Sequence, residues 1–216
     1  MPGRNKVWIF RDAHYKKGNG VAAPGERKFQ ILQTLAGMLE TPGGEKITTA
    51  ALAARLDVSE AALYRHFASK AQMFEGLIEF IEQSVFGLIN KITSSQDSGL
   101  AQVEAIVSLL LGFAQKNPGM TRVLIGDALV NENARLQARI NQLHDRLEAT
   151  LRQCLRIAAG HGDTRAELDT TAAGNLLLCY VVGRWHQFAK SGFKRLPAEA
   201  FTTQWALLSA DLKTKV

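Results

Sequence analysis

Apolar residues recur at steps of three and four along almost the whole chain after residue 25. The period is that of an α-helix with one face turned toward a core, and no segment shows the alternation typical of a β-strand. The two longest stripes consist of Phe74, Leu77, Ile78, Ile81, Val85, Leu88 and Ile92, and of Leu136, Ile140, Leu143, Leu147, Leu151 and Leu155. The pattern predicts an all-α fold of about nine helices.

Breaks in the pattern place these helices at about 27–40, 49–56, 59–67, 69–93, 100–116, 127–159, 167–190 and 197–213, with a short one after 118. We expect three parts: a basic flexible tail (1–25), a three-helix helix-turn-helix domain (26–70) and a larger helical bundle (71–216). The tail holds five Lys/Arg against one Asp and shows no helical period. Such a segment is typical of disorder or of a basic arm that reaches DNA.

Positive charge is concentrated near the N-terminus. Residues 1–70 contain 11 Lys/Arg and six Asp/Glu, a net charge of +5, whereas the remaining residues contribute only +1 of the total of +6. A protein that neutralises DNA phosphates needs a basic face. The counts are equally compatible with an ordinary solvated surface.

The segments 49–56 and 59–67 read as the two helices of a helix-turn-helix, joined at Asp57. An Asp tolerates the left-handed backbone that such tight turns need. In this motif the second helix lies in the major groove of DNA. Apolar Leu52, Leu63 and Phe67 are expected to face inward, which leaves the polar edge of 59–67 for DNA.

The residue types on that edge suit a duplex. Arg65 can pair with a guanine edge or a phosphate, and the donors of Tyr64 and His66 suit phosphate oxygens. Helix N-termini attract phosphate through free amides. The alternative is that Tyr64 packs in the small domain while His66 caps it. The candidate DNA contacts are Thr48, Thr49, Ser59, Glu60, Ala61, Tyr64, Arg65, His66 and Lys70.

The stretch ITTAALAARLDVSEAALYRHFASKAQMFEGLI, residues 47–78, resembles the DNA-binding domain of the TetR family of bacterial regulators. Its core pattern is V-S-x-x-x-L-Y-x-H-F-x-S-K, with Asp57 where the family usually has glycine. Four segments are similar to the nucleoid occlusion factors of that family: SEAALYRHF, MF and LIEFIE from Met73, LLLGF and KNPGMTRVL from Leu109, and RLQARINQL from Arg135.

The resemblance implies a homodimer that binds short palindromic chromosomal sites in double-stranded DNA. On DNA, such factors engage the division GTPase FtsZ and block assembly of the Z ring over the nucleoid. The resemblance implies no cofactor and no small-molecule inducer. It also implies association with the nucleoid, and the N-terminal segment has no continuous apolar stretch of the signal-peptide kind, so we expect a cytoplasmic protein.

One helical surface is a candidate for the FtsZ contact. Phe80 lies about a third of a turn off the apolar stripe of its helix. A large aromatic ring at this position is either covered by a neighbouring helix or part of an exposed apolar surface that can bind a partner. On the next helix Leu109, Gly112 and Lys116 share a face that Asn117 extends, and the resemblance favours this surface. Ordinary packing within the bundle is the alternative.

The last two helices carry more apolar residues than two outer helices of a monomer need. They are expected to pack against the same two helices of a second copy in a four-helix dimer interface. The alternative is that they are buried within one chain. The candidates are Tyr180, Trp185, Phe188, Trp205, Leu208 and Leu212.

Other functions are less favoured. The sequence has no HExxH, G-x-S-x-G or phosphate-loop pattern, so we expect no catalytic residues and no metal ligands. No apolar run is long enough for a membrane span, and both cysteines are expected to be reduced and buried. A ligand-responsive TetR-type repressor is the main alternative, and an interaction scaffold without DNA binding is another.

Overall fold

The computed structural model describes residues 25–41 and 47–213, so the expected tail lies outside the described residues apart from Gly25. All named secondary-structure elements of these residues are helices, which confirms the all-α class. In chain order they form α1 (Glu26–Leu39), α2 (Thr49–Arg55), α3 (Glu60–Tyr64), α4 (Lys70–Ser95), α5 (Gly99–Lys116), α6 (Pro118–Leu124), the 3₁₀ turn η2 (Asp127–Leu129), α7 (Ala134–Gly160), α8 (Thr170–Lys190) and α9 (Phe201–Ser209).

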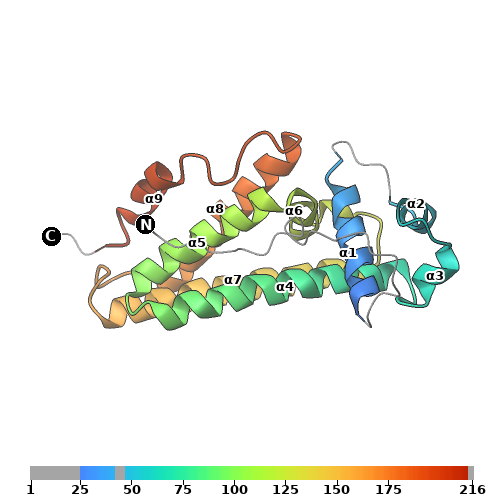
Figure 1. Cartoon of the computed structure of the whole chain (residues 1–216). Coiled ribbons are helices and arrows are strands. Elements are labelled where there is room, and N and C mark those ends of the chain that lie inside the picture. The colour runs from blue at the N-terminus through green and yellow to red at the C-terminus, as the bar shows by residue number, and fades with distance from the viewer. Residues whose placement is uncertain (1–24, 42–46, 214–216) are drawn as a thin grey trace, which may run out of the picture.

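The helices form an elongated molecule with its small N-terminal helices at one end (Figure 1). α4, α5 and α7 run along its length, and α8 packs chiefly against α7 and also against α5. At the end that carries the small N-terminal helices, α1 crosses α4, and α2 and α3 lie outermost. The predicted DNA-binding helix α3 is therefore at an extremity of the molecule, where a long duplex has room to approach.

Polar side chains begin most of these helices. Ser59, Ser69, Ser98, Asn133 and Asp169 each accept a hydrogen bond from a backbone N–H of the first turn that follows. Such caps satisfy amides that have no partner inside the helix. They explain why α3 and α4 start where the sequence pattern predicts.

The expected helix at 127–159 is wrong at its start. Gly126 and Asn131 adopt positive φ angles of 77° and 64°, so the chain forms one 3₁₀ turn and then a loop before Asn133 caps α7. Asparagine tolerates this conformation better than most residues do. The loop brings Glu132 close to the start of α4, and this proximity is used below.

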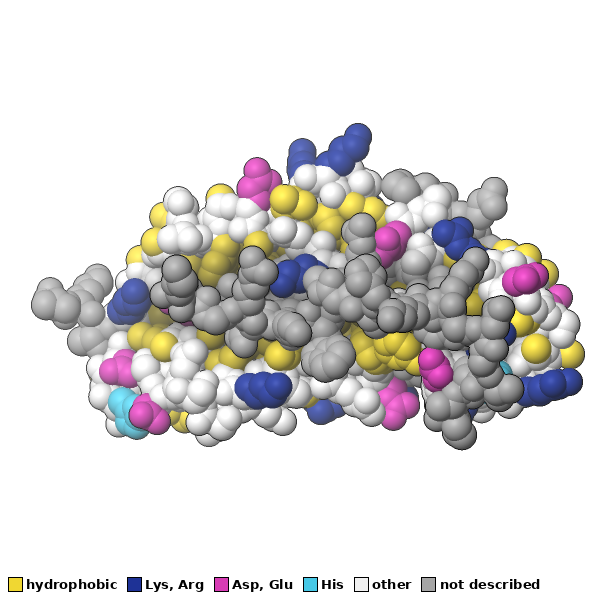
Figure 2. Space-filling view, viewed as in Figure 1, with side chains coloured by type: hydrophobic (Ala, Val, Ile, Leu, Met, Phe, Trp, Pro, Cys, Tyr) yellow, Lys and Arg dark blue, Asp and Glu magenta, His cyan; other side chains and the backbone are white. Residues whose placement is uncertain are grey.

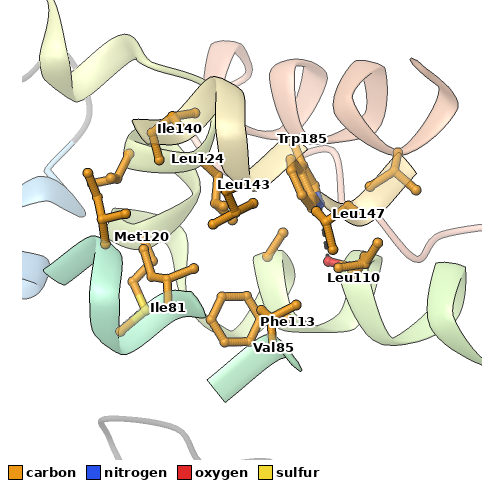
Figure 3. Close-up of a cluster of buried hydrophobic side chains, with 14 of the residues drawn as sticks. Ile81, Val85, Leu110, Phe113, Met120, Leu124, Ile140, Leu143, Leu147 and Trp185 are labelled. Atoms are coloured by element: carbon orange, nitrogen blue, oxygen red, sulfur yellow. Dashed lines mark hydrogen bonds between the residues drawn. The ribbon is translucent and has the colours of Figure 1, made fainter. Parts of the chain in front are cut away.

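Figure 3 shows the centre of the bundle, where aliphatic and aromatic side chains of α4, α5, α6, α7 and α8 lie together. Trp185 of α8 is 1% exposed, and its indole N–H donates to the carbonyl oxygen of Leu110 at 3.1 Å. Burial of such a side chain removes large apolar area from water, and the hydrogen bond satisfies its one polar group. The same buried cluster continues from α1 to the end of the described chain.

Close backbone contact joins α1 to α6. A Cβ atom added to Gly119 of α6 would lie 2.0 Å from the carbonyl oxygen of Ala36 and 3.1 Å from Cβ of Leu39. Only a glycine allows this approach. The contact fixes the DNA-binding end relative to the bundle.

The two cysteines differ in their exposure to solvent. Cys154 is buried as expected, and burial raises the pKa of its thiol to about 11. Cys179 is exposed on α8, so the expectation of burial is wrong for this residue. Periodicity along α8 placed it in a helix without showing which side a neighbour covers.

Among the described residues, no helix combines the length and the apolar character that crossing a bilayer would require.

Candidate nucleic-acid interface

The helix-turn-helix is held by a small apolar contact between α2 and α3. Leu52 and Leu63 are each 1% exposed, and Phe67 is 8% exposed beyond the end of α3. Asp57 adopts a φ of 54°, the left-handed conformation expected for the turn. The outer face of α3 therefore projects away from the core.

Three helix N-termini border this face. Thr48 accepts from the N–H of Ala51, and Ser59 accepts from the N–H of Ala62. Ser69 accepts from the N–H of Gln72, whose side chain accepts in turn from the N–H of Ala68. Capped helix starts present their remaining amides and the positive end of the helix dipole to the surroundings.

The polar edge of α3 is open to solvent. Tyr64 is 45% exposed, and Glu60, Ala61 and Arg65 are also exposed, whereas His66 is half-buried. At this end of the molecule both basic and acidic side chains reach the surface (Figure 2). The alternative in which Tyr64 packs inside the small domain does not hold in this structure.

Two of these residues join α3 to α2. The Thr49 hydroxyl donates to Oε2 of Glu60 at 2.5 Å, and the Tyr64 hydroxyl donates to Oγ1 of Thr49 at 3.5 Å. The three side chains thus form one cluster across the turn, which we call the 49–60–64 cluster. The sequence identified its members but gave no indication of their contact.

Lys70, the first residue of α4, is paired with Glu132 in the loop before α7. The two side chains are only 21% and 13% exposed. The ammonium group predicted to contact phosphate is therefore held by a carboxylate of the larger domain. A cavity of about 200 Å³ adjoins this ion pair.

A second ionic group lies on the same cavity. Asp127 accepts from Arg122 at 2.7 Å and from Lys190 at 3.2 Å, and Arg122 also donates to the carbonyl oxygen of Leu39 at the end of α1. Burial acts to raise the pKa of Asp127, but the two cations outweigh it and hold that pKa below its usual value. These contacts tie α1, α6 and α8 together.

The residues predicted to form the partner surface between α4 and α5 are only partly exposed. Phe80 and Leu109 are half-buried, and Lys116 is exposed. A Cβ atom added to Gly112 would meet nothing within 4 Å. The space above Gly112 is therefore open to an approaching chain.

Asn117 does not belong to that surface. It is 4% exposed, and its side-chain amide donates to the carbonyl oxygen of Phe113 at 2.8 Å. Asn117 lies at the junction of α5 and α6, where it satisfies the end of α5. The prediction that it extends the partner surface is wrong.

The predicted dimer contacts also need correction. Trp185 and Phe188 are each 1% exposed, Trp205 is 5% exposed and Leu212 is 6% exposed within the single chain. These four side chains stabilise the intramolecular core and offer almost no surface to a second copy. Tyr180 and Leu208 are half-buried, and the Tyr180 hydroxyl donates to Gln204 of α9 at 2.6 Å.

Different side chains of α8 and α9 reach the surface. Leu207 is 75% exposed and Leu176 is 57% exposed, and Cys179 and Gly183 are exposed between turns of α8. Helix periodicity alone could not predict that these residues are exposed, because it does not show which neighbouring elements cover each side of a helix.

Within residues 25–41 and 47–213, no group of three or more His, Cys, Asp or Glu side chains is placed to hold a metal ion.

Two family models match the chain. Residues 31–77 match the bacterial regulatory proteins of the tetR family, and residues 97–213 match a tetracyclin repressor-like C-terminal domain of the SlmA-like type. The class is therefore that of a TetR-type DNA-binding regulator.

Relatives that match the chain over most of its length identify a smaller family within this class. The nucleoid occlusion factor SlmA of Alteromonas mediterranea is 53% identical over 180 residues, 83% of this chain and 92% of the relative. That of Vibrio cholerae is 50% identical over 188 residues, 87% of this chain and 96% of the relative. The chain belongs to the SlmA family of nucleoid occlusion factors.

Solved structures agree in fold at low identity. A TetR transcription regulator from Haloarcula marismortui gives a TM-score of 0.75 at 16% identity, covering 88% of this chain and all of that one. A fatty acid degradation regulator from Bacillus halodurans gives 0.73 at 17% identity, covering 90% of this chain and all of that one. These similarities confirm the fold alone.

Proposed function

We propose that this protein is a dimeric, sequence-specific DNA-binding protein that acts as a nucleoid occlusion factor. On palindromic chromosomal sites it engages FtsZ and prevents ring assembly over the nucleoid. The chief support is the identity of about 50% to SlmA proteins across both the DNA-binding and the C-terminal parts. The projecting polar edge of α3 supports the DNA-binding half of the proposal.

The DNA contacts are assigned to Thr48, Thr49, Tyr64 and Arg65, with the capped helix starts beside them. Replacement of Thr48 or Tyr64 by Ala should lower affinity for operator DNA while the dimer stays intact. Fluorescence anisotropy at several salt concentrations measures the affinity. Unchanged affinity in both variants would remove these side chains from the interface.

The FtsZ contact is assigned to the α4/α5 surface that includes Phe80, Leu109, Gly112 and Lys116. Replacement of Phe80 by Ala should keep DNA binding and abolish the disassembly of FtsZ polymers by the DNA-bound protein. Light scattering of FtsZ polymers with and without operator DNA measures this effect. A Phe80→Ala protein that still disassembles polymers would exclude Phe80 from the contact.

The dimer interface is assigned to exposed residues of α8 (Leu176, Cys179 and Gly183) and of α9 (Leu207). A monomer in water would leave these leucines solvated, and pairing two copies would bury them. Leu207→Glu should therefore dissociate the dimer in sedimentation experiments. Val130→Glu is the matched control, because Val130 is similarly exposed, at 67%, on the loop after η2.

Genome-wide mapping of bound DNA tests the whole proposal. Nucleoid occlusion predicts sites scattered around the chromosome and sparse near the replication terminus. A single site beside a neighbouring gene would instead indicate a local transcriptional repressor.

A further inference from the structure

Glu60 is an unexpected side chain for a surface that approaches DNA. It is the first residue of α3, it is exposed, and it ion-pairs with no Lys or Arg of the described residues. Phosphates repel a carboxylate, so a solvent-facing Glu at this position weakens non-specific binding. The attraction of Glu60 to the helix dipole offsets part of that repulsion but requires no specific orientation of the carboxylate.

The 49–60–64 cluster does orient it. The hydroxyl of Thr49 has a single proton, which it donates to Oε2 of Glu60, and it accepts from the Tyr64 hydroxyl through a lone pair. Both bonds bridge the turn between α2 and α3, so the carboxylate is held relative to both helices. The other carboxylate oxygen, Oε1, makes no hydrogen bond with any described residue and remains able to accept one.

An ionised carboxylate only accepts hydrogen bonds, which restricts what it can recognise on DNA. Phosphates, guanine N7 and O6, and thymine O4 are all acceptors and would be repelled. The major-groove donors are the amino groups of cytosine N4 and adenine N6, and adenine presents its N7 acceptor beside the donor. Cytosine is therefore the base that a fixed carboxylate matches best.

We propose that Glu60 reads the N4 amino group of a cytosine in each operator half-site, with Thr49 and Tyr64 as positioning residues. This inference rests on the proposed function, because it assigns a base preference to the same DNA-binding surface. Glu60 then acts as a specificity device: it disfavours DNA in general and accepts one base in particular.

The test is a base-substitution series on the full-length dimer. An operator is first selected from random duplexes with the unaltered protein, and each base pair of a half-site is then replaced in turn. At one C·G pair, replacement by T·A should weaken binding roughly 5- to 150-fold, the range for one well-placed base contact. In Glu60→Ala that ratio should fall to within about twofold of one at the same position while the other positions keep theirs.

Glu60→Gln gives the sharpest outcome. An amide can both donate and accept, and it suits the N6 and N7 pair of adenine. This variant, which has nearly the same shape, should change the preferred base at that position from cytosine to adenine. Thr49→Val should reduce the cytosine preference and Thr49→Ser should restore it, because serine retains the hydroxyl.

A purely structural role for Glu60 gives a different result. Loss of a helix-stabilising charge would lower affinity for every sequence by the same factor and leave all base preferences unchanged, which would overturn the inference. Circular dichroism and gel filtration confirm that each variant is folded and dimeric before binding is measured. If the unaltered protein selects no sequence at all, the proposed function itself is wrong. If it selects one and Glu60→Ala keeps every preference, only the inference about Glu60 is wrong.

Discussion

The Gly119→Ala substitution tests whether the α1–α6 contact fixes the two parts of the molecule together. The added Cβ would lie 2.0 Å from the carbonyl oxygen of Ala36 and 3.0 Å from its carbonyl carbon. Carbon and oxygen atoms in close contact are normally about 3.3 Å apart, so the two backbones must separate by more than about 1 Å. Neither obstacle is a flexible side chain that could turn away.

The cost has two sources that act together. Overpacking in a close-packed interior typically costs about 1–3 kcal/mol, and a rigid backbone obstacle places this site at the upper end. Separation also weakens packing around Leu39, which is 3% exposed in the same contact. For a chain of this length, a loss of about 3 kcal/mol lowers Tm by about 6–12 °C.

Urea unfolding at a fixed dimer concentration measures this loss, since dissociation would otherwise shift the midpoint. Gly87→Ala is the matched control. Gly87 is exposed in α4, and a Cβ added there meets nothing within 4 Å. The control should gain about 0.5–1 kcal/mol from the better helix propensity of alanine. A Gly119→Ala protein as stable as the unaltered one would refute the close-approach argument.

Three further perturbations have defined outcomes. Glu132→Gln should release Lys70 for phosphate and raise DNA affinity a few-fold in anisotropy titrations while lowering stability by about 1 kcal/mol; weaker DNA binding would contradict this. Burial lowers the pKa of His144, so the folded state binds fewer protons and stability falls as pH drops below the unfolded value of about 6.5. His144→Gln should therefore lose less stability than the unaltered protein between about pH 7.5 and 5.5, and equal losses in urea titrations would refute the assignment. A thiol reagent should label Cys179 in a monomeric variant but slowly in the dimer, and it should label Cys154 slowly in both; equal Cys179 rates would exclude the α8 face from the interface.

The sequence was sufficient for the helices because their apolar stripes repeat over many turns. The stripe from Leu136 to Leu155 lies in α7, and Asp57 adopts the left-handed turn expected from its position between two short helices. Both features depend on local periodicity or local backbone geometry. The predicted start of α7 is wrong, because positive φ angles at Gly126 and Asn131 interrupt a segment whose composition still suits a helix.

The identity of the neighbour that covers an apolar face could not be predicted. Trp185 and Cys179 lie on the same helix, yet the first packs on α5 within the chain and the second is exposed. Periodicity gives the direction of each side chain around its own helix and says nothing about which element lies opposite. The buried Asn117 illustrates the same limit for a polar residue.

Residue type and helix position together were sufficient to predict which side chains of α3 are exposed, such as Tyr64 and Arg65. The contacts of α3 with α2 could not be predicted, since the bond from Thr49 to Glu60 spans 11 residues and depends on how α2 and α3 cross. The pairing of Lys70 with Glu132, 62 residues away, was equally invisible to local patterns.

α4 is one uninterrupted helix of 26 residues that starts with Lys70 and carries Phe80 ten residues later. At about 1.5 Å per residue, roughly 15 Å along the axis separates these two side chains. Under the contacts proposed above, a filament subunit docked over Phe80 would therefore lie within about 15 Å, along α4, of DNA bound at the start of that helix. The chromosome would then sterically obstruct the filament on that side. Such obstruction would require no large conformational change in the protein.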